Sequence, residues 1–210
     1  MTKENSNSGK EKSPENVFVQ QLDINSDDAT TNFQTLIDSM GGMDIYFHVS
    51  GIGYQNVPLD YDKELRTAET NCKGFTRMIT YAFNYFEQQG KGHIACITSI
   101  AGTKGLGVSP AYSATKRYQN HYIQCMAQLA TIRKVKITFT DIRPGFVATD
   151  LLNDNHNYPM LMKKEFVAQE AYKAVARKRR VKIIDWRYNL LVTAWKLIPN
   201  CVWERLPIKN

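Results

Sequence analysis

Short apolar runs alternate with longer amphipathic segments along most of the chain. The apolar runs are typical of buried strands and predict strands over residues 17–22, 44–49, 93–98, 135–141 and 181–186. The segments between them repeat apolar positions at helical spacing and predict helices over residues 27–39, 60–89, 110–132, 166–179 and 188–197. Strands that alternate with helices predict an α/β fold with a parallel sheet and right-handed crossovers.

The pattern also divides the chain into regions. Residues 1–16 are almost wholly polar and predict a disordered tail. Residues 17–210 then predict one domain, since 210 residues suffice for a single substantial core. Within it, residues 151–164 form a polar, proline-containing stretch that interrupts the alternation of strands and helices.

Composition describes an ordinary globular protein with a mild basic excess. The chain is 43% hydrophobic and 22% charged, with a net charge of +7. A basic balance can indicate nucleic acid or a membrane surface, but no zinc spacing, RNA-binding signature or heptad accompanies it. The run Arg177-Lys178-Arg179-Arg180 fits the solvated end of a helix, where cations are favoured. We therefore expect no nucleic-acid partner.

The four cysteines, the hydropathy and the N-terminus bear on location. The cysteines are widely spaced with no Cys-x-x-Cys, which indicates reduced, mostly buried thiols and no metal site. No run approaches the roughly 18 apolar residues that cross a bilayer, and the polar N-terminus has no apolar core of a signal peptide. These features predict a cytoplasmic protein without a transmembrane segment.

Candidate chemistry gathers between residues 93 and 116. Ser99 ends a predicted strand, where parallel α/β sheets usually place ligand chemistry. Pro110 opens the next helix, and Tyr112 and Lys116 are four residues apart on one face of it. An ammonium beside a phenol lowers the pKa of the tyrosine, which could then pass a proton. A solvated helix face often produces Tyr-x-x-x-Lys as well, so this pair alone is a weak signal.

Two flanking elements strengthen it. Asn71 lies in Glu-Thr-Asn-Cys-Lys-Gly, and residues 143–149 read Arg-Pro-Gly-Phe-Val-Ala-Thr. Together with Ser99, Tyr112 and Lys116, these elements resemble the short-chain dehydrogenase/reductase family in order and spacing. The resemblance covers the chain from about Val17 almost to its C-terminus and implies a Rossmann-like, doubly wound parallel sheet.

The resemblance also implies the reaction and the roles of four residues. The reaction would be reversible hydride transfer between NAD or NADP and an alcohol or carbonyl substrate. Tyr112 would be the general acid/base, and Lys116 would lower its pKa and bind the nicotinamide ribose. Ser99 would hold the substrate oxygen. Asn71 would hold a relay water at a local distortion of its helix.

The family pattern further implies a cofactor site, a flap and an assembly. The residues that would contact the cofactor besides Tyr112 and Lys116 are Asp23, Ile24, Ser50, Gly51, Pro144, Gly145, Val147 and Thr149. His48 departs from the family pattern and is predicted to be a packed residue. Residues 151–164 would be a mobile flap over the substrate. Family members commonly pair the helices corresponding to 60–89 and 110–132, which predicts a homodimer or homotetramer.

One element of the family pattern is missing from the sequence. No Gly-x-x-x-Gly-x-Gly turn follows a strand here, although such a turn cradles the pyrophosphate. The pattern thus predicts an N-terminally truncated sheet, in which the strand at 17–22 either moves beside the strand at 44–49 or leaves an apolar edge exposed. The alternative function is a non-catalytic remnant or interaction protein. We expect this chain neither to bind NAD(P)H tightly nor to turn over.

Overall fold

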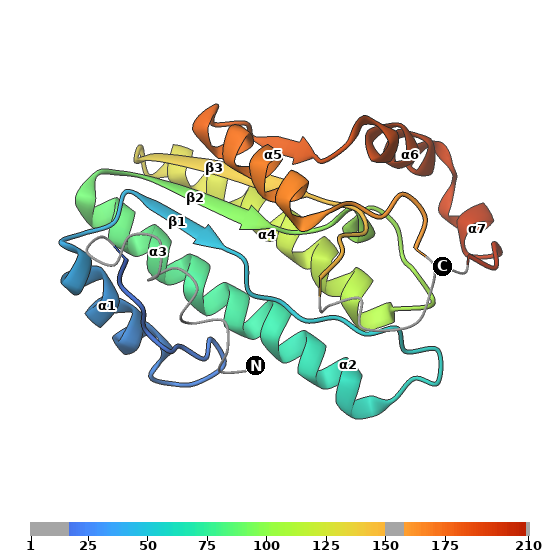
Figure 1. Ribbon diagram of the computed structural model, residues 1–210, viewed down its shortest axis with the longest axis horizontal. Helices are drawn as coiled ribbons and strands as arrows, with labels where there is room; N and C mark the ends of the chain where they lie inside the picture. Colours follow the sequence, from blue (N-terminus) through green and yellow to red (C-terminus); the bar gives the residue numbers. More distant parts are fainter. Residues whose placement is uncertain (1–16, 150–157, 209–210) are drawn as a thin grey trace.

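A computed structural model describes residues 17–149 and 158–208. Its centre is a four-stranded sheet in the order β1-β2-β3-β4, and every neighbouring pair is parallel (Figure 1). The strands are β1 (Ile45–His48), β2 (Lys91–Ile97), β3 (Lys136–Arg143) and β4 (Val181–Ile183). Four of the five predicted strands are therefore confirmed, and so is the parallel α/β class.

The predicted strand at 17–22 is wrong. These residues adopt no regular structure and run beside α1 without joining the sheet (Figure 1). A strand gains its stability from a hydrogen-bonded neighbour, and among the described residues β1 pairs only with β2. Tyr46 and His48 of β1 face α3, so Ile45 and Phe47 point to the opposite face of the sheet, where they are 51% and 41% exposed. Of the two predicted arrangements, the exposed apolar edge is the one observed.

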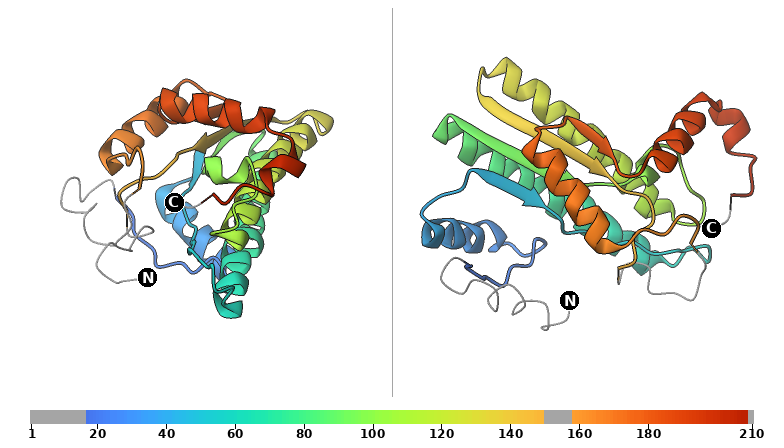
Figure 2. Two further views of the ribbon diagram at one scale, coloured as in Figure 1. Left: turned by 90° about the vertical axis from the view of Figure 1, so that its right-hand side faces the viewer. Right: turned by 45° about the horizontal axis from the view of Figure 1, so that its top comes forward.

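Helices cover both faces of the sheet (Figure 2). The segments on the first face are α1 (Ala29–Met40), α2 (Tyr61–Ala68), η3 (Glu69–Gly74), α3 (Phe75–Gln89) and α4 (Pro110–Ile132). The segments on the second face are α5 (Lys164–Ala176), α6 (Trp186–Leu197) and, at its edge, α7 (Asn200–Trp203). A single turn of 3-10 helix, η4 (Ile100–Gly102), follows β2. The predicted helices are confirmed to within a few residues, and α7 was not predicted.

Two apolar clusters hold these layers together. The larger one joins α1, α3 and α4 to the sheet through buried side chains such as Phe75, Phe83 and Ile123. Phe83 of α3 stacks on Phe139 of β3 with 6.5 Å between the ring centroids. The smaller cluster joins α5 and α6 to β3 and is built around Ile142 and Tyr188. The two clusters lie on opposite faces of the sheet.

The ends of the helices follow from their sequences. The Asp60 side chain accepts a hydrogen bond from the Lys63 N–H and caps α2. Gly90 ends α3 in the left-handed conformation, with φ at 83°. Pro110 occupies the first turn of α4, where a missing N–H costs nothing. None of the described helices is both long enough and apolar enough to span a membrane.

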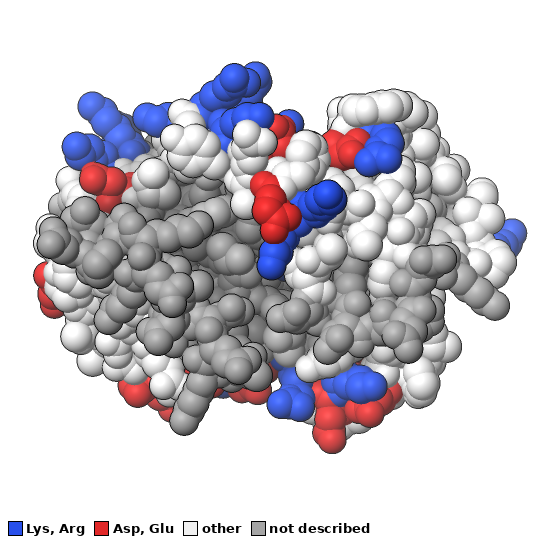
Figure 3. All heavy atoms as spheres, viewed as in Figure 1, with Lys and Arg blue, Asp and Glu red and all other residues white. Residues whose placement is uncertain are grey.

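The basic run is an exposed turn. Arg177 caps α5, and residues 178–180 connect it to β4 with their side chains exposed. Figure 3 shows Lys and Arg side chains along the upper edge of the molecule, where this turn lies. The run therefore matches the predicted solvated helix end.

Candidate active site

Ser99 lies at the carboxyl end of β2, where the chain turns into η4. Its Oγ accepts a hydrogen bond from the Ala101 N–H (3.1 Å), which caps the 3-10 turn, and lies 3.5 Å from the Pro144 carbonyl oxygen. The Ser99 side chain is buried, with 6% of its surface exposed. A serine whose oxygen caps a turn is held in one rotamer, so the position of its Oγ is fixed.

The first turns of α4 bring a phenol and an ammonium to this hydroxyl. Tyr112 lies near Ser99, whose side chain acts to lower the pKa of the phenol. Lys116 lies one turn further along α4, and its Nζ is 5.6 Å from the centre of the Tyr112 ring. Only 5% of Lys116 is exposed. The structure thus brings the predicted serine, tyrosine and lysine together at the carboxyl edge of the sheet.

Asn71 reaches the same place from the long helix. It lies in η3, a π-helical segment between α2 and α3, so the predicted local distortion of this helix is present. The Asn71 side chain is fully buried and holds the Ile52 backbone from both sides: Oδ1 accepts from the Ile52 N–H (2.9 Å), and Nδ2 donates to the Ile52 carbonyl (2.7 Å). Nδ2 also donates to Thr115 Oγ1 of α4 (3.0 Å). Asn71 therefore fixes the loop after β1 against the helix of Tyr112.

That loop passes very close to Tyr112. A Cβ added to Gly53 would lie 2.3 Å from Cδ2 of the Tyr112 ring, and one added to Gly51 would lie 3.4 Å from Lys116 Nζ. A glycine is required at 53 because no side chain fits between the loop and the ring. Ser50 precedes these glycines, and its carbonyl oxygen lies 3.1 Å from His48 Nε2. Of the predicted cofactor positions Ser50 and Gly51, Gly51 is therefore beside Lys116, and Ser50 precedes it in the chain.

His48 is packed, as predicted. It is 2% exposed, its Nδ1 is 2.8 Å from the Tyr46 hydroxyl, and its ring lies edge-on to Phe75. Burial, followed by the charge of Lys116, lowers the pKa of His48 to about 4. The imidazole is thus neutral at physiological pH and serves as a hydrogen-bonded core residue.

The pKa of Tyr112 lies above its ordinary value. Burial raises it, and the Ser99 side chain opposes the rise only in part. Burial also lowers the pKa of Lys116 to about 8, while Cys96 and Asp141 act the other way. At a pH high enough to ionise the phenol, Lys116 has lost its charge and cannot stabilise the phenolate. The net shift of the Tyr112 pKa is therefore upward because of burial, and its lowering by Lys116 stays a prediction.

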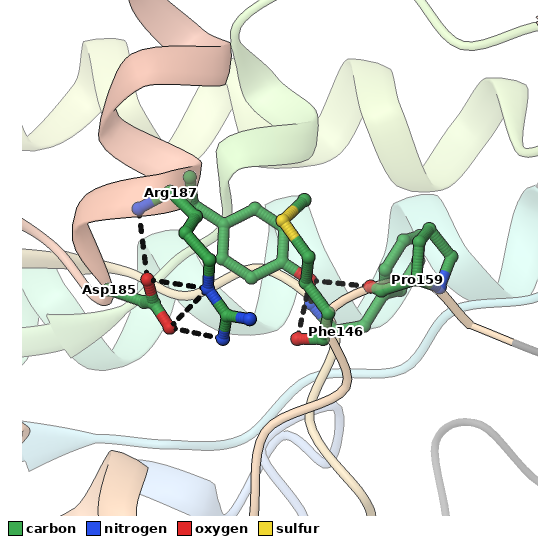
Figure 4. Close-up of polar contacts among 6 residues, drawn as sticks. Phe146, Pro159, Asp185 and Arg187 are labelled. Carbon is green, nitrogen blue, oxygen red and sulfur yellow. Dashed lines mark hydrogen bonds and ion pairs between the residues drawn. The ribbon is translucent and has the colours of Figure 1, made fainter.

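The turn at 144–149 adjoins Ser99. The contact that requires a glycine at position 145, however, is with Tyr188 of α6. The Pro144 carbonyl accepts a hydrogen bond from the Ile100 N–H (3.1 Å). A Cβ added to Gly145 would lie 2.2 Å from the Tyr188 ring of α6. The Tyr188 hydroxyl in turn accepts from the Phe146 N–H (3.1 Å) and is within 3.1 Å of the carbonyl oxygens of residues 159 and 160 (Figure 4). Gly145 is thus needed for this packing, whatever else approaches the turn.

The described end of the predicted flap, residues 158–164, borders the turn at 144–149. Residues 150–157, and with them most of the predicted flap, lie outside the described residues. Val147 forms a parallel bridge with Met162, and Thr149 follows it in an exposed position. The Tyr158 ring packs on Phe146 with 4.7 Å between the ring centroids, and the Gln55 side chain donates to the Tyr158 hydroxyl (3.0 Å). The described end of the flap therefore reaches both the turn and the loop after β1.

Asp23 and Ile24 lie beside the helix of Asn71 and do not contact the other site residues. Asp23 is exposed and accepts a hydrogen bond from the Asn25 N–H (2.9 Å). Ile24 is buried against Gly74, and the Asn25 side chain donates to Thr70 Oγ1 (3.0 Å). Ile24 and Asn25 therefore contact the π-helical segment at Gly74 and Thr70, and Asp23 precedes them.

Sequence reasoning missed a buried ion pair under the site. Asp141 of β3 is fully buried, accepts from Thr98 Oγ1 (2.6 Å) and is bound by the Arg143 guanidinium, with Nε at 2.8 Å. Thr98, Asp141 and Arg143 lie on the face of the sheet that carries α4. The sequence contained a signal for this ion pair. Asp141 and Arg143 are two residues apart in a predicted strand, so they share a face of the sheet, and a buried charge there needs a partner.

A second missed residue is Gln119. It is fully buried on α4 and hydrogen-bonded to both Lys116 and Asn71. Its spacing of three residues from Lys116 places both on one face of the helix, which is the only sequence signal for it.

The polar cluster at the carboxyl edge of a parallel sheet defines an α/β protein with an enzyme-like site. The sequence profile of the family described as "short chain dehydrogenase" matches residues 2–158. The chain therefore belongs to the short-chain dehydrogenase family, whose fold is Rossmann-like and whose members are oxidoreductases.

Individual relatives agree with this assignment. An uncharacterised oxidoreductase of Myxococcus xanthus is 25% identical over 189 residues, which is 88% of this chain and 74% of that protein. The 3-ketoacyl-(acyl-carrier-protein) reductase of Brucella melitensis, solved with NADH, superposes with a TM-score of 0.67 at 21% identity over 78% of this chain and 75% of its own. An alcohol dehydrogenase of Comamonas testosteroni specific for bulky-bulky ketones gives a TM-score of 0.71 at 19% identity, over 98% and 80%. The two solved structures support the fold.

Proposed function

We propose that the cluster of Ser99, Tyr112, Lys116 and Asn71 is the acid–base centre of an NAD(P)-dependent oxidoreductase that interconverts an alcohol and a carbonyl compound. The observation that carries this proposal is the convergence of two groups on Tyr112: the Ser99 side chain acts to lower the pKa of its phenol, and the buried Lys116 ammonium lies 5.6 Å from its ring centre. General acid–base catalysis needs a proton donor fixed by its neighbours, and Tyr112 would be that donor.

Each side chain then has a defined task. In the reducing direction, the Tyr112 hydroxyl would give its proton to the substrate oxygen while the Ser99 hydroxyl holds that oxygen in place. Lys116 would return a proton to the phenolate. Because burial disfavours a lone phenolate, the tyrosine is a stronger base once ionised, and recapture of a proton from Lys116 is favourable. Asn71 would keep the loop after β1 seated over the tyrosine ring through its two bonds to Ile52.

The residues present fit the nicotinamide end of the cofactor. The ammonium of Lys116 and the hydroxyl of Tyr112 are hydrogen-bond donors suited to ribose hydroxyls. Gly51 leaves a side-chain-free backbone beside that ammonium. The turn containing Pro144, Gly145, Val147 and Thr149 would border the nicotinamide ring, and Asp23 with Ile24 would meet the adenine. A nicotinamide group held here would supply or accept the hydride. The relatives solved with NADH support a nicotinamide cofactor, and both NAD and NADP are compatible with the described residues.

The substrate and the assembly follow the family. A small-molecule alcohol or carbonyl compound would enter between the turn at 144–149 and the loop after β1, where Phe146 and Tyr158 pack together. A homodimer or homotetramer would pair α3 and α4 across their outer faces. Those faces carry Tyr118 stacked on Tyr122, with 5.6 Å between the ring centroids.

A second candidate function rests on one observation of the sheet. Among the described residues, no strand lies beyond β1. The sequence also contains no Gly-x-x-x-Gly-x-Gly turn to hold a pyrophosphate. A chain with the acid–base cluster but no pyrophosphate anchor would serve as a non-catalytic interaction protein.

One experiment separates the two functions. The purified chain is assayed with millimolar NADH or NADPH and a panel of diacetyl, cyclohexanone and acetophenone. If the site is catalytic, Tyr112→Phe lowers the rate of cofactor oxidation by about 10²–10⁴-fold, since the phenol proton is lost while the ring packing remains. The matched control is Tyr122→Phe, which removes a hydroxyl from the same helix outside the cluster.

An unchanged rate in Tyr112→Phe would contradict the proposed role of the tyrosine. If the unsubstituted chain shows no rate at all with any of these pairs, the second candidate function is favoured.

A further inference from the structure

The side chain of Gln119 joins two groups of the proposed centre. Lys116 Nζ donates to Gln119 Oε1 (3.1 Å), and Gln119 Nε2 donates to the Asn71 carbonyl oxygen (2.9 Å). Gln119 is 0% exposed, so these protein groups replace water around its amide. A buried amide without partners would destabilise the fold, whereas this one is satisfied at both ends.

The Asn71 carbonyl is available because of the π-helical turn. In an α-helix it would accept from the N–H four residues later, which belongs to Phe75. In η3 the Phe75 N–H bonds instead to the carbonyls of Cys72 and Thr70. The Asn71 carbonyl is therefore not taken by the Phe75 N–H, and it accepts from Gln119 of α4.

The orientation of the amide follows from its two partners. The ammonium of Lys116 can only donate, so the amide oxygen must face it. The Asn71 carbonyl can only accept, so the amide nitrogen must face it. Rotating the amide by half a turn would oppose two donors at one end and two acceptors at the other. The bridge therefore has a single allowed direction, from Lys116 to Asn71.

We propose that Gln119 is the positioning residue of the centre: it holds the Lys116 ammonium against the π-helical turn and closes the inner side of Lys116 to proton transfer. The proposal rests on the function assigned above to Lys116. A carboxamide accepts a hydrogen bond from an ammonium but is far too weak a base to take its proton. Gln119 therefore cannot itself pass a proton to or from Lys116.

The charged groups around Lys116 allow its titration to be followed separately. Cys96 of β2 faces it as a thiol whose pKa burial raises well above the ordinary value. Asp141 of β3 is bound by Arg143, and His48 of β1 is neutral above its pKa of about 4. On α4 itself, burial raises the pKa of Tyr112. Between about pH 6 and 9, Lys116 is thus the group of this set that changes its charge.

The test measures the titration of Lys116 directly in the full chain without cofactor or substrate. The chain is labelled with ¹³C-lysine, and the Lys116 Cε resonance is assigned with Lys116→Arg and followed by NMR against pH. The unsubstituted chain should titrate at about 8. Gln119→Leu removes the acceptor that favours the charged form, and the midpoint should fall by roughly one pH unit. Gln119→Glu places a carboxylate there, and the midpoint should rise.

The matched control is Gln124→Leu, the same substitution on the exposed face of α4, which should leave the midpoint unchanged. A folded Gln119→Leu chain in which Lys116 titrates as before would overturn the proposal. If Gln119→Leu does not fold, Gln119→Glu decides, and a midpoint that fails to rise would overturn it. Because no turnover is measured, failure of this test is distinct from failure of the proposed enzymatic function.

Discussion

Lys116 and Tyr112 respond to the same burial in opposite directions. An ammonium and a phenolate are both charged forms, so burial lowers the pKa of the first and raises that of the second. Near neutral pH, the Tyr112 phenol is thus neutral, and the Lys116 ammonium lies within about one pH unit of its pKa. A proton shared between these two side chains requires little change in the charge of the buried site.

His48 gives the first prediction at this scale, and it concerns acid stability. A histidine whose folded pKa is about 4, against 6.5 when unfolded, binds fewer protons in the folded chain between those pH values. Its stabilising contribution is therefore complete above pH 6.5 and is lost as the pH falls toward 4. We expect unfolding by urea to show about 2 kcal/mol less stability at pH 5 than at pH 7 from this group alone.

His48→Gln should remove that pH-dependent part, whatever it does to stability at pH 7. His121→Gln, at an exposed position on α4, is the control and should keep the dependence. Equal acid sensitivity in the His48→Gln chain and the unsubstituted chain would show that the imidazole is already protonated when folded.

The site residues that could be predicted from the sequence are those that belong to a motif with fixed order and spacing. Ser99, Tyr112, Lys116 and Asn71 were found because their spacing is fixed by a strand end and a helix face. Gln119 was missed because its role depends on the Asn71 carbonyl, 48 residues away along the chain, which no local pattern connects to it. The raised pKa of Tyr112 was missed for a related reason: the spacing revealed the neighbouring lysine but not the depth of burial.

At the scale of elements, the π-helical turn is held by a close contact at Gly74. A Cβ at this position would lie 2.8 Å from both Asn25 Oδ1 and Ile24 Cγ1. Alanine ordinarily favours a helix over glycine by about 1 kcal/mol. Here the methyl group would push residues 24–25 away from the helix, and overpacking costs about 1–3 kcal/mol.

We therefore expect Gly74→Ala to lower the free energy of unfolding by about 1 kcal/mol or more in a urea titration. Gly107→Ala is the control, because a Cβ there has no neighbouring atom within 4 Å, and its effect should stay within about 0.5 kcal/mol. A neutral or stabilising Gly74→Ala would mean that the segment at 24–25 gives way without cost.

Helices were easier to predict than strands, and the reason is physical. The helix over 110–132 was predicted to the residue because its hydrogen bonds lie within the segment and Pro110 marks its start. The segment at 17–22 has the composition of a strand, but strand formation depends on a partner that the segment does not itself contain. The short helix α7 follows Pro199 and has only four residues, too few for a periodic pattern.

At the scale of the whole molecule, the open side of β1 bears on cofactor affinity. The described sheet ends where a pyrophosphate-binding turn would be expected, and the sequence contains no such turn. Losing two or three charge-assisted hydrogen bonds, each about 1.5–3 kcal/mol, weakens a micromolar affinity to about the millimolar range. We therefore expect fluorescence titration of the 210-residue chain with NADH or NADPH to show no saturation below about 1 mM.

Lys116→Met is the control for that titration, since any residual binding at the ribose end should depend on the ammonium. Saturation at low micromolar NADH would contradict the expectation and would show that other parts of the chain hold the pyrophosphate.

The Tyr188 hydroxyl links three segments that are distant in sequence: α6, the turn at Phe146 and the end of the flap at Pro159 and Met160. None of these contacts can survive if α6 detaches, because all three share one oxygen atom. Local opening of α6 therefore releases the turn and the flap in the same event. In amide hydrogen exchange, the Phe146 N–H should thus exchange no more slowly than α6 itself opens, so that these segments behave as one cooperative unit.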